Sequence, residues 1–170
     1  EIELHDFMQD IVKDMNPMFQ EKGLEIKCEC AAAYKPVVFV DATLLRQVVM
    51  NLLANAVRYT EKGGTIAMRL APENGGVLCS VKDDGIGIPD AYKDKVFEKF
   101  FRAENAVSKV PEGNGLGLNL VKNLVEMWKG RVWFVSPAEW REGGTVVKKG
   151  TEFYFTIPTT VRKDSTGPKK

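Results

Sequence analysis

The stretch that most constrains this chain is residues 83–89, where a carboxylate pair is followed by alternating glycines (Asp-Asp-Gly-Ile-Gly-Ile-Pro). It comes directly after residues 77–81, an apolar run typical of a buried strand. Glycine permits backbone angles closed to other residues and lets a ligand approach the main chain. A carboxylate at a strand end, beside such bare backbone, can accept a hydrogen bond from an amino group. The alternative is a solvated Asp-Gly hairpin turn, which Pro89 and the polar helix predicted after it disfavour.

The size and charge of the chain bound what it can be. Its 170 residues suit one domain, and 44% hydrophobic with 28% charged residues is normal for a soluble globule. The formal net charge is +1, so we expect neither nucleic acid nor an anionic membrane surface as a partner. No apolar run reaches spanning length and no signal peptide is visible, so we expect a cytoplasmic domain. Because the chain begins at Glu1, we expect a piece of a longer protein.

Three cysteines, Cys28, Cys30 and Cys79, lie in strand-like runs. A Cys-x-Cys pair with no second cluster makes a poor zinc site in a chain whose only histidine is His5. We therefore predict core or half-buried thiols in a reducing compartment.

Hydrophobic periodicity divides the rest of the chain into helices and strands. Apolar residues at helical spacing predict helices over residues 4–22, 42–59 and 118–128. Asp41 is a good N-cap for the second helix, and Gly23 and Gly130 end the first and third. Strands are predicted over residues 24–30, 37–40, 65–70, 77–81, 131–136 and 152–157. The remaining predictions are a short helix over 90–97, a mobile loop over 103–114, a hairpin end over 142–150 and a disordered basic tail from 162.

One face of the predicted helix 42–59 carries an unusual polar stripe. Gln47, Asn51, Asn55 and Arg58 stand at i, i+4, i+8 and i+11, so they line up along the helix. Asparagine is a poor helix former, and a merely solvated face usually carries Glu and Lys. A solvated face is the alternative, but two asparagines one turn apart indicate that this face binds a polar group. Their side-chain oxygens are hard ligands that suit a Mg²⁺ ion, which keeps its waters and also binds phosphate.

A second glycine-rich stretch, residues 113–118 (Gly-Asn-Gly-Leu-Gly-Leu), leads straight into the third predicted helix. Glycines at a helix N-terminus leave free N–H groups and the positive end of the helix dipole for an anion. The spacing is neither the dinucleotide-binding fingerprint nor a Walker A sequence, so alone it is a weak signal. Before it, residues 97–102 place three phenylalanines beside Arg102.

Taken together, these stretches closely resemble the sequence boxes of the catalytic and ATP-binding domain of sensor histidine kinases. That domain belongs to the superfamily of gyrase, Hsp90, histidine kinase and MutL. The resemblance covers nearly the whole chain, and each box alone is modest evidence, but five occur in register. In order, residues 51–59 (Asn-Leu-Leu-Ala-Asn-Ala-Val-Arg-Tyr) resemble the N box, 83–89 the G1 box, 97–102 the F box, 113–118 the G2 box, and 150–153 (Gly-Thr-Glu-Phe) a last, shorter glycine box.

The resemblance implies an α/β fold of the Bergerat type, a two-layer sandwich in which a mixed β-sheet packs on three α-helices. Residues 1–158 would form the domain and residues 159–170 a disordered basic tail. ATP would lie between the helical layer and a mobile lid, about residues 98–114.

The resemblance also implies roles for single residues. Asp83 would accept the adenine amino group, and Tyr59 would pack against the base. Asn55 would bind Mg²⁺, and Asn51 would help to hold the phosphates.

Cationic side chains and main-chain N–H groups would complete the phosphate site. Arg58 and Arg102 would neutralise phosphate charge, as a guanidinium does well, and residues 115–118 would offer N–H groups. The implied catalytic residues are Asn51 and Arg102, and the implied metal ligand is Asn55. The implied nucleotide-binding residues are Asn51, Asn55, Arg58, Tyr59, Asp83, Gly85, Gly87, Ile88, Phe101, Arg102, Gly113, Gly115, Leu116, Gly117, Leu118 and Thr151.

Two positions depart from the wider superfamily. Its ATP-hydrolysing branches place a Glu where this chain has Asn51, and that Glu activates water as a general base, which an amide cannot do. The substitution fits a kinase branch, in which attack by water is unwanted. Many members carry Asn where this chain has Asp84, so we expect added negative charge near the site and a slightly greater demand for Mg²⁺.

A histidine kinase also needs a phosphoacceptor histidine on a dimerising helical hairpin. His5 opens the helix that belongs to the ATP domain in this family, and the strand from residue 24 follows too soon for a hairpin of two long helices. We therefore expect the ATP-binding half of a larger kinase. The whole protein would move the γ-phosphoryl group of ATP to a histidine on a dimerisation and histidine-phosphotransfer domain, and this piece alone would bind ATP without phosphorylating itself.

The expected partners are ATP or ADP, that phosphotransfer domain and, indirectly, the receiver domain of a response regulator. The parent is expected to be a homodimer and a candidate inner-membrane sensor. Two alternatives stay open. One is an anti-sigma-type serine kinase, which shares the boxes but usually lacks the aromatic F box, and the other is a non-catalytic ATP-binding module. A non-enzymatic partner-binding domain with a degenerate pocket would not need intact Asn55, Asp83 and glycines, so these residues argue against it.

Overall fold

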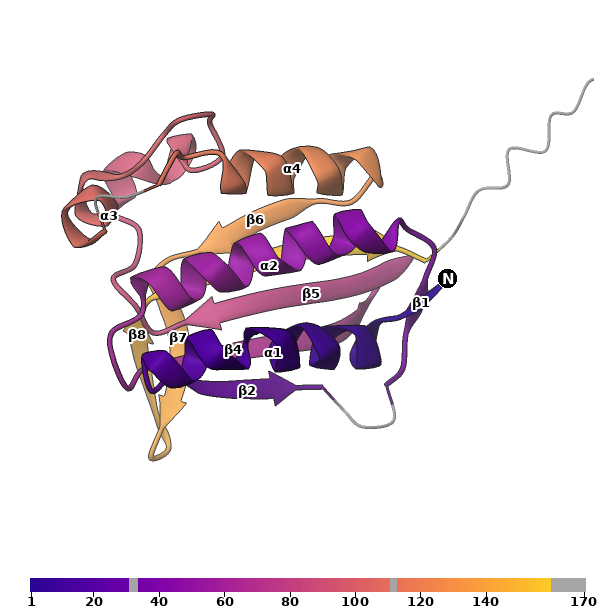
Figure 1. Cartoon of the computed structure of the whole chain (residues 1–170), viewed down its shortest axis with the longest axis horizontal. Helices are drawn as coiled ribbons and strands as arrows, with labels where there is room; N and C mark the ends of the chain where they lie inside the picture. Colours follow the sequence, from indigo (N-terminus) through magenta and orange to yellow (C-terminus); the bar gives the residue numbers. More distant parts are fainter. Residues whose placement is uncertain (31–33, 111–112, 160–170) are drawn as a thin grey trace, which may run out of the picture.

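The computed structural model describes residues 1–30, 34–110 and 113–159. The described chain folds into two layers, in which three long helices lie over one face of a five-stranded sheet (Figure 1). The helices are α1 (Leu4–Glu21), α2 (Ala42–Tyr59) and α4 (Gly117–Met127). The two-layer α/β arrangement predicted from the sequence is confirmed. None of the helices in the described part of the chain is long and apolar enough to cross a membrane.

The sheet has the strand order β2-β4-β5-β9-β6. β2 pairs with β4 in parallel and the other neighbours pair antiparallel, so the sheet is mixed, as predicted. Asp83, the last residue of β5, lies opposite Thr151, the first residue of β9. The 83–89 stretch therefore leaves the sheet at the end of two adjacent strands. The strands are β2 (Glu25–Glu29), β4 (Thr65–Glu73), β5 (Gly76–Asp83), β6 (Val132–Val135) and β9 (Thr151–Pro158).

The helical layer is ordered α1, α2, α4, with α2 in the middle (Figure 1). Asp41 begins α2 as predicted, because its Oδ1 accepts a hydrogen bond from the Leu44 N–H at 2.9 Å. Apolar side chains at helical spacing turn each helix toward the sheet. Residues that are fully buried at this interface include Leu4, Ile11, Phe19, Leu45, Val48, Leu52, Leu53, Ile66, Val77, Val121, Val125 and Phe155.

The C-terminal end of α2 is capped by a lysine that follows α1. Lys22 Nζ donates to the carbonyl oxygens of Val57 at 2.7 Å, Arg58 at 3.1 Å and Thr60 at 2.8 Å. An ammonium group beside the last carbonyls of a helix complements the negative end of the helix dipole. Burial lowers the pKa of the Lys22 ammonium group. This cap fixes the last turn of α2.

The segment between β5 and α4 holds more regular structure than predicted. A 3₁₀-helix, η1 (Asp90–Lys95), replaces the short helix expected over residues 90–97. The helix α3 (Glu104–Lys109) lies in the stretch expected to be a loop, so that prediction is wrong for these residues. Six residues are too few to show a periodic apolar face, which is why the pattern missed them. An ion pair between Lys109 and Glu61 links α3 to the loop after α2.

A separate hairpin lies beyond the end of β5 (Figure 1), where the sequence predicts an exposed hairpin end. Its strands are β7 (Ala138–Glu142) and β8 (Thr145–Lys149). Trp140 is 8% exposed, and its ring packs against the ammonium groups of Lys82 and Lys149, 4.4 Å and 5.9 Å from the ring centroid. A short pair of strands, β1 (Ile2–Glu3) and β3 (Val37–Val38), joins the start of α1 to the segment before α2.

Several predicted boundaries shift. β4 ends three residues later than predicted and β5 begins one residue earlier, so the connection between them is shorter. The strands meet at a tight turn at Gly75, whose φ is +78°. Cys79 is buried and Cys30 half-buried, as predicted, but Cys28 on the edge strand β2 is exposed, so the prediction is wrong for that thiol. The tail predicted to be disordered lies outside the described residues from residue 160 onward, as do residues 111–112 of the predicted lid.

Candidate functional site

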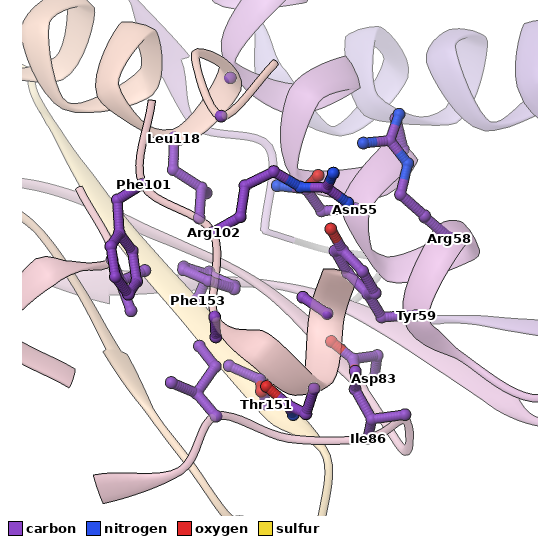
Figure 2. Close-up of a pocket in the computed structure, with 18 of the residues that line it drawn as sticks. Asn55, Arg58, Tyr59, Asp83, Ile86, Phe101, Arg102, Leu118, Thr151 and Phe153 are labelled. Carbon is purple, nitrogen blue, oxygen red and sulfur yellow. The ribbon is translucent and has the colours of Figure 1, made fainter. Parts of the chain in front are cut away.

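A cavity of about 210 Å³ lies where α2, the start of α4 and the 83–89 stretch meet (Figure 2). The structure brings residues from all five sequence boxes to this one place, although the boxes are spread over about a hundred residues of chain. The predicted site residues that line it are Asn51, Asn55, Arg58, Tyr59, Asp83, Gly87, Ile88, Phe101, Arg102, Gly115, Gly117, Leu118 and Thr151.

Asp83 lies at one end of the cavity with its carboxyl group almost removed from water. The residue is 6% exposed, and the Gly85 N–H donates to its Oδ1 at 2.9 Å. Burial raises the pKa of the Asp83 carboxyl to about 7, and main-chain hydrogen bonds from Gly85 and Thr151 oppose that rise. A buried carboxyl with a raised pKa in a cavity is a candidate for recognising an N–H donor of a ligand.

Two glycines let the backbone close around Asp83. A Cβ at Gly150, whose φ is +65°, would lie 1.9 Å from the Asp83 carbonyl oxygen. A Cβ at Gly85 would lie 2.4 Å from the Tyr59 carbonyl oxygen. Gly85 does not line the cavity. Its part is to hold the Asp83 carboxyl group through its N–H, which differs from the ligand contact predicted for it.

Asp84 does not line the cavity, but its negative charge lies near enough to contribute to the raised pKa of the Asp83 carboxyl. Its Oδ1 accepts a hydrogen bond from the Thr65 N–H at 2.9 Å. Its Oδ2 lies 3.3 Å from Lys149 Nζ on β8. The carboxylate therefore joins β4 to the hairpin, and a lysine offsets its charge.

Ser136, which follows β6, is hydrogen-bonded to two segments that line the cavity. Its Oγ accepts a hydrogen bond from the Ile88 N–H at 2.8 Å and donates to the Gly150 carbonyl oxygen at 2.9 Å. The Thr151 hydroxyl donates to the same Oγ at 3.3 Å. Because Ser136 is 4% exposed, water cannot replace these bonds. One hydroxyl thus joins the 83–89 stretch to the start of β9.

We expect Ser136→Ala to lower the free energy of unfolding by about 1–3 kcal/mol, because it leaves the buried Ile88 N–H and Gly150 carbonyl without their partner. Urea denaturation would measure the loss. Ser108→Ala, at an exposed position on α3, is the matched control and should change stability by less than about 0.5 kcal/mol. A Ser136→Ala midpoint equal to that of the unchanged chain would show that the hydroxyl does not carry this junction.

The cavity changes character from one end to the other (Figure 2). Asp83 lies at one end, and Asn55 and Arg102 lie at the other, with the Tyr59 ring between them. Apolar side chains also line the cavity; they include Ile86, Ile88, Val96, Phe101, Leu118 and Phe153. An arrangement of an acidic end, an apolar slot and a cationic end fits a ligand with an amino-bearing flat ring and a separate anionic part.

The two arginines of the cationic end converge on the glycine-rich stretch before α4. The Arg102 guanidinium donates to the main-chain carbonyls of Val110 and Gly113. A Cβ at Gly113 would lie 3.2 Å from Arg58 Nη1 and 3.4 Å from Arg102 Cζ. Gly113 does not itself line the cavity, so its backbone contacts the arginines rather than the cavity space.

The start of α4 packs closely against α2. The Asn51 Nδ2 donates to the Gln47 carbonyl oxygen at 2.8 Å, and a Cβ at Gly117 would lie 2.7 Å from Asn51 Oδ1. Glycine at this position therefore lets the helix N-terminus approach the polar stripe. Leu116 does not line the cavity; it is 36% exposed, and its N–H donates to Asn114 Oδ1 at 3.1 Å.

The sequence reasoning missed a further set of lining residues. Some fall inside the predicted boxes and would have been found by including every residue of each box. Others lie in the stretch around α3, where the sequence offers no signal for single positions. The missed residues are Ala54, Ile86, Val96, Ala103, Asn105, Ala106, Asn114 and Phe153.

Comparison with known families decides what kind of cavity this is. A family model described as "Histidine kinase-, DNA gyrase B-, and HSP90-like ATPase" matches residues 40–161, which include every lining residue of the cavity. The chain belongs to this ATPase family. The resemblance seen in the five sequence boxes is thereby confirmed.

Relatives of this ATPase domain include sensory kinases. The adaptive-response sensory kinase SasA of Gloeothece citriformis is 36% identical over 150 residues, which cover 88% of this chain and 35% of that protein. The SasA protein of Crocosphaera subtropica is 33% identical over 159 residues, which cover 93% of this chain and 38% of that protein. The chain thus spans little more than a third of the length of these relatives.

Solved structures of the same fold are histidine kinases. The catalytic domain of the histidine kinase ThkA has a TM-score of 0.75 at 25% identity, over 94% of this chain and 96% of that one. Full-length ShkA, solved in complex with AMPPNP, has a TM-score of 0.73 at 28% identity, over 92% of this chain and 30% of that one. The fold of this chain is therefore that of histidine kinase catalytic domains.

Asn55, predicted from the sequence as a metal ligand, lines the ATPase cavity. The Asn55 amide oxygen is a hard ligand of the kind that Mg²⁺ accepts together with waters and phosphate oxygens. Among the described residues, the cluster of three His, Cys, Asp or Glu side chains close enough to share an ion is Glu3, His5 and Asp6, at the start of α1 and outside the cavity. The residues of the cavity fit a metal that arrives with a phosphate-bearing ligand.

Proposed function

We propose that this chain binds ATP with Mg²⁺ and serves as the catalytic domain of a sensor histidine kinase. The observation that carries the proposal is one cavity with a buried carboxyl at one end and amide and guanidinium groups at the other, in a histidine kinase fold. The AMPPNP complex of ShkA supports a nucleotide as the ligand. The adenine base would take the Asp83 end and the phosphates the Arg58 and Arg102 end.

The base end would recognise adenine by its amino group. Asp83 would accept that N–H with a carboxyl group that is almost buried. Tyr59 would pack against the ring, and Phe101 lines the side of the cavity away from Tyr59 (Figure 2). The cavity of about 210 Å³ is smaller than the roughly 300–1,000 Å³ of a typical ligand pocket. The described part of the lid, residues 98–110 and 113–114, would therefore move outward to admit ATP.

The phosphate end would hold charge without activating water. Arg58 and Arg102 would balance the phosphate charge, and the N-terminus of α4 would present N–H groups beside Gly117. Asn55 would ligate Mg²⁺, whose other ligands would be phosphate oxygens and water. Asn51 would hold the phosphates, and as an amide it cannot act as a general base. Catalysis would then rest on positioning and electrostatics.

The acceptor would be a histidine on a dimerisation and histidine-phosphotransfer domain of the same protein. His5 is a poor candidate, since it lies in α1, outside the cavity, with its ring nitrogens 3.4 Å from Asp6 Oδ1 and from Gln9 Nε2. A response regulator would receive the phosphoryl group next, and the parent would be a cytoplasmic or membrane-anchored homodimer. The sensory-kinase relatives, of which the chain spans about a third, support this assignment.

The binding part of the proposal is tested by calorimetry with ADP or a non-hydrolysable ATP analogue. We expect one site in the presence of Mg²⁺, because Asn55 alone cannot hold the ion and needs the phosphates to complete its ligands. Nucleotide at a hundred times its dissociation constant should stabilise the fold by about 2.7 kcal/mol. Mg²⁺ without nucleotide is the control and should give no heat. Absence of both heat and thermal shift at millimolar nucleotide would refute the proposal.

A further inference from the structure

A second, much smaller void is lined by α1, β2 and β4 at the edge of the sheet. Its volume is about 10 Å³, which is room for about one water-sized sphere. It shares no lining residue with the ATPase cavity in the described part of the chain. Four of its eight lining side chains carry sulfur; the lining residues are His5, Met8, Gln9, Cys28, Cys30, Met68, Arg69 and Leu70.

The sheet register places these sulfur-bearing side chains side by side. Cys28 lies opposite Met68 in the parallel pairing of β2 with β4, and neighbouring strands are about 4.8 Å apart. Cys30 follows two residues after Cys28, so both thiols point to the same face of the sheet. Met8 approaches from α1, which lies over these strands (Figure 1), and is only 6% exposed. Three segments therefore direct sulfur at one small void.

The side chains around this void are unusual for a simple apolar junction. The chain has three cysteines and six methionines, and four of these nine line this one void. Cys28 is exposed, so its side chain contributes little to the core, but a metal ion could reach it from solvent. His5 also lines the void, but its ring nitrogens lie 3.4 Å from Asp6 Oδ1 and from Gln9 Nε2. Sulfur is therefore the main donor that the void offers.

Two other roles for the paired thiols fit less well. Loss of water around Cys28 and Cys30 raises the pKa of both thiols, so neither is an activated nucleophile. Residues two apart in a strand are separated by about 6.6 Å, whereas a disulfide needs Cβ atoms about 3.5–4.5 Å apart. Two metal–sulfur bonds of about 2.3 Å, the length found at zinc, span up to about 4.6 Å between the sulfur atoms. A metal ion can therefore bridge the two thiols where a disulfide cannot.

We propose that this void binds one soft monovalent cation, Cu(I) or its analogue Ag(I), through the thiolates of Cys28 and Cys30 and the thioethers of Met8 and Met68. Thiolate and thioether ligands select Cu(I), whereas Mg²⁺ and Ca²⁺ need oxygen ligands, and no described carboxylate lines the void. Zinc sites use Cys, His and carboxylate ligands and not thioethers. Binding of one ion releases one proton from each thiol. The site is separate from nucleotide binding and does not depend on it.

The test is an anaerobic titration of the full chain with Cu(I) held in solution by the competing chelator bicinchoninate. We expect one Cu(I) per chain. Met8→Leu and Met68→Leu each remove one thioether and keep an apolar side chain of similar size. Each should weaken Cu(I) binding about tenfold or more, because replacing even an outer-shell partner of a metal costs about 10–100-fold. The double variant Cys28→Ser with Cys30→Ser should lose the site, and circular dichroism would show that the fold persists.

Met18→Leu is the matched control, since Met18 is exposed on α1 and does not line the void; its Cu(I) affinity should be unchanged. Zn²⁺ in excess should not displace the bound Cu(I). Equal Cu(I) affinity in the unchanged chain, Met8→Leu and Met68→Leu would overturn the inference, because the thiols would then bind metal without the void. Binding retained in the double cysteine variant, or displacement by Zn²⁺, would overturn it equally.

Discussion

Asp83→Ala is expected to weaken ATP binding roughly 5- to 150-fold, because the adenine amino group would be buried without its acceptor at a cost of about 1–3 kcal/mol. Calorimetry with a non-hydrolysable ATP analogue would measure the change, and circular dichroism would show that the fold persists. Asp94→Ala is the matched control, since Asp94 is exposed on η1 and lines no part of the cavity. Equal affinity in Asp83→Ala and the unchanged chain would contradict the assignment.

Because the pKa of Asp83 is raised, the measured nucleotide affinity should also depend on pH. Its folded value of about 7 lies above the ordinary value of 3.8, so the empty domain favours the protonated acid. The stability that this group contributes is fully present below about pH 4 and is lost as pH rises to about 7. An adenine N–H donor favours the ionised carboxylate instead, so nucleotide binding should release a proton.

Nucleotide affinity should therefore rise with pH and level off above pH 7. At pH 6 it should be about tenfold weaker than on the plateau, because one pH unit below the pKa corresponds to a factor of ten. Phosphate groups also titrate in this range, and Asp83→Asn separates the two contributions, since it removes the carboxyl group but not the phosphates. An identical pH dependence in Asp83→Asn would show that Asp83 is not the titrating group.

The parts of the site that the sequence predicts are those set by local pattern. Asn51 and Asn55 lie one turn apart on a helix whose boundaries, residues 42–59, match α2 exactly as its apolar spacing and Asp41 cap require. Asp83 could be placed at a strand end because the apolar run stops there and glycine follows. In both cases the residues that set the local structure, the apolar pattern and the neighbouring cap or glycine, lie in the same helix or strand as the predicted site residue or directly beside it.

The parts that the sequence does not predict depend on contacts between distant residues. The Lys22 cap joins carbonyls 35 to 38 residues away, and the Ser136 hydroxyl reaches Ile88 across 48 residues. Asp84 directly follows Asp83, the last residue of β5, and the sequence gives no sign of the partners of its carboxylate. Its carboxylate is taken up by Thr65 and Lys149. Such contacts become visible only once the sheet register is known.

The absence of a general base at Asn51 and the position of His5 predict what this chain does with γ-labelled ATP. Incubated alone, it should bind the nucleotide and hydrolyse it very slowly, because Asn51 cannot activate water. It should acquire no acid-labile label, because His5 lies outside the cavity. Adding the histidine-bearing hairpin domain of the same parent should place label on that histidine. The label should be lost in acid, since a phosphohistidine is acid-labile and a phosphoserine ester is stable.

Label found elsewhere would contradict a specific part of the proposal. Label on the chain alone that disappears in His5→Ala would make His5 the acceptor, and would require α1 to leave the core that Leu4 and Ile11 anchor at 0% exposure. Acid-stable label on a partner protein would mark a serine kinase and overturn the histidine kinase assignment. The matched control is Asp83→Ala in the reconstituted reaction. At nucleotide concentrations below the dissociation constant its labelling should fall by the same roughly 5- to 150-fold as its affinity, because the transfer step needs only a seated nucleotide and the phosphate end is unchanged.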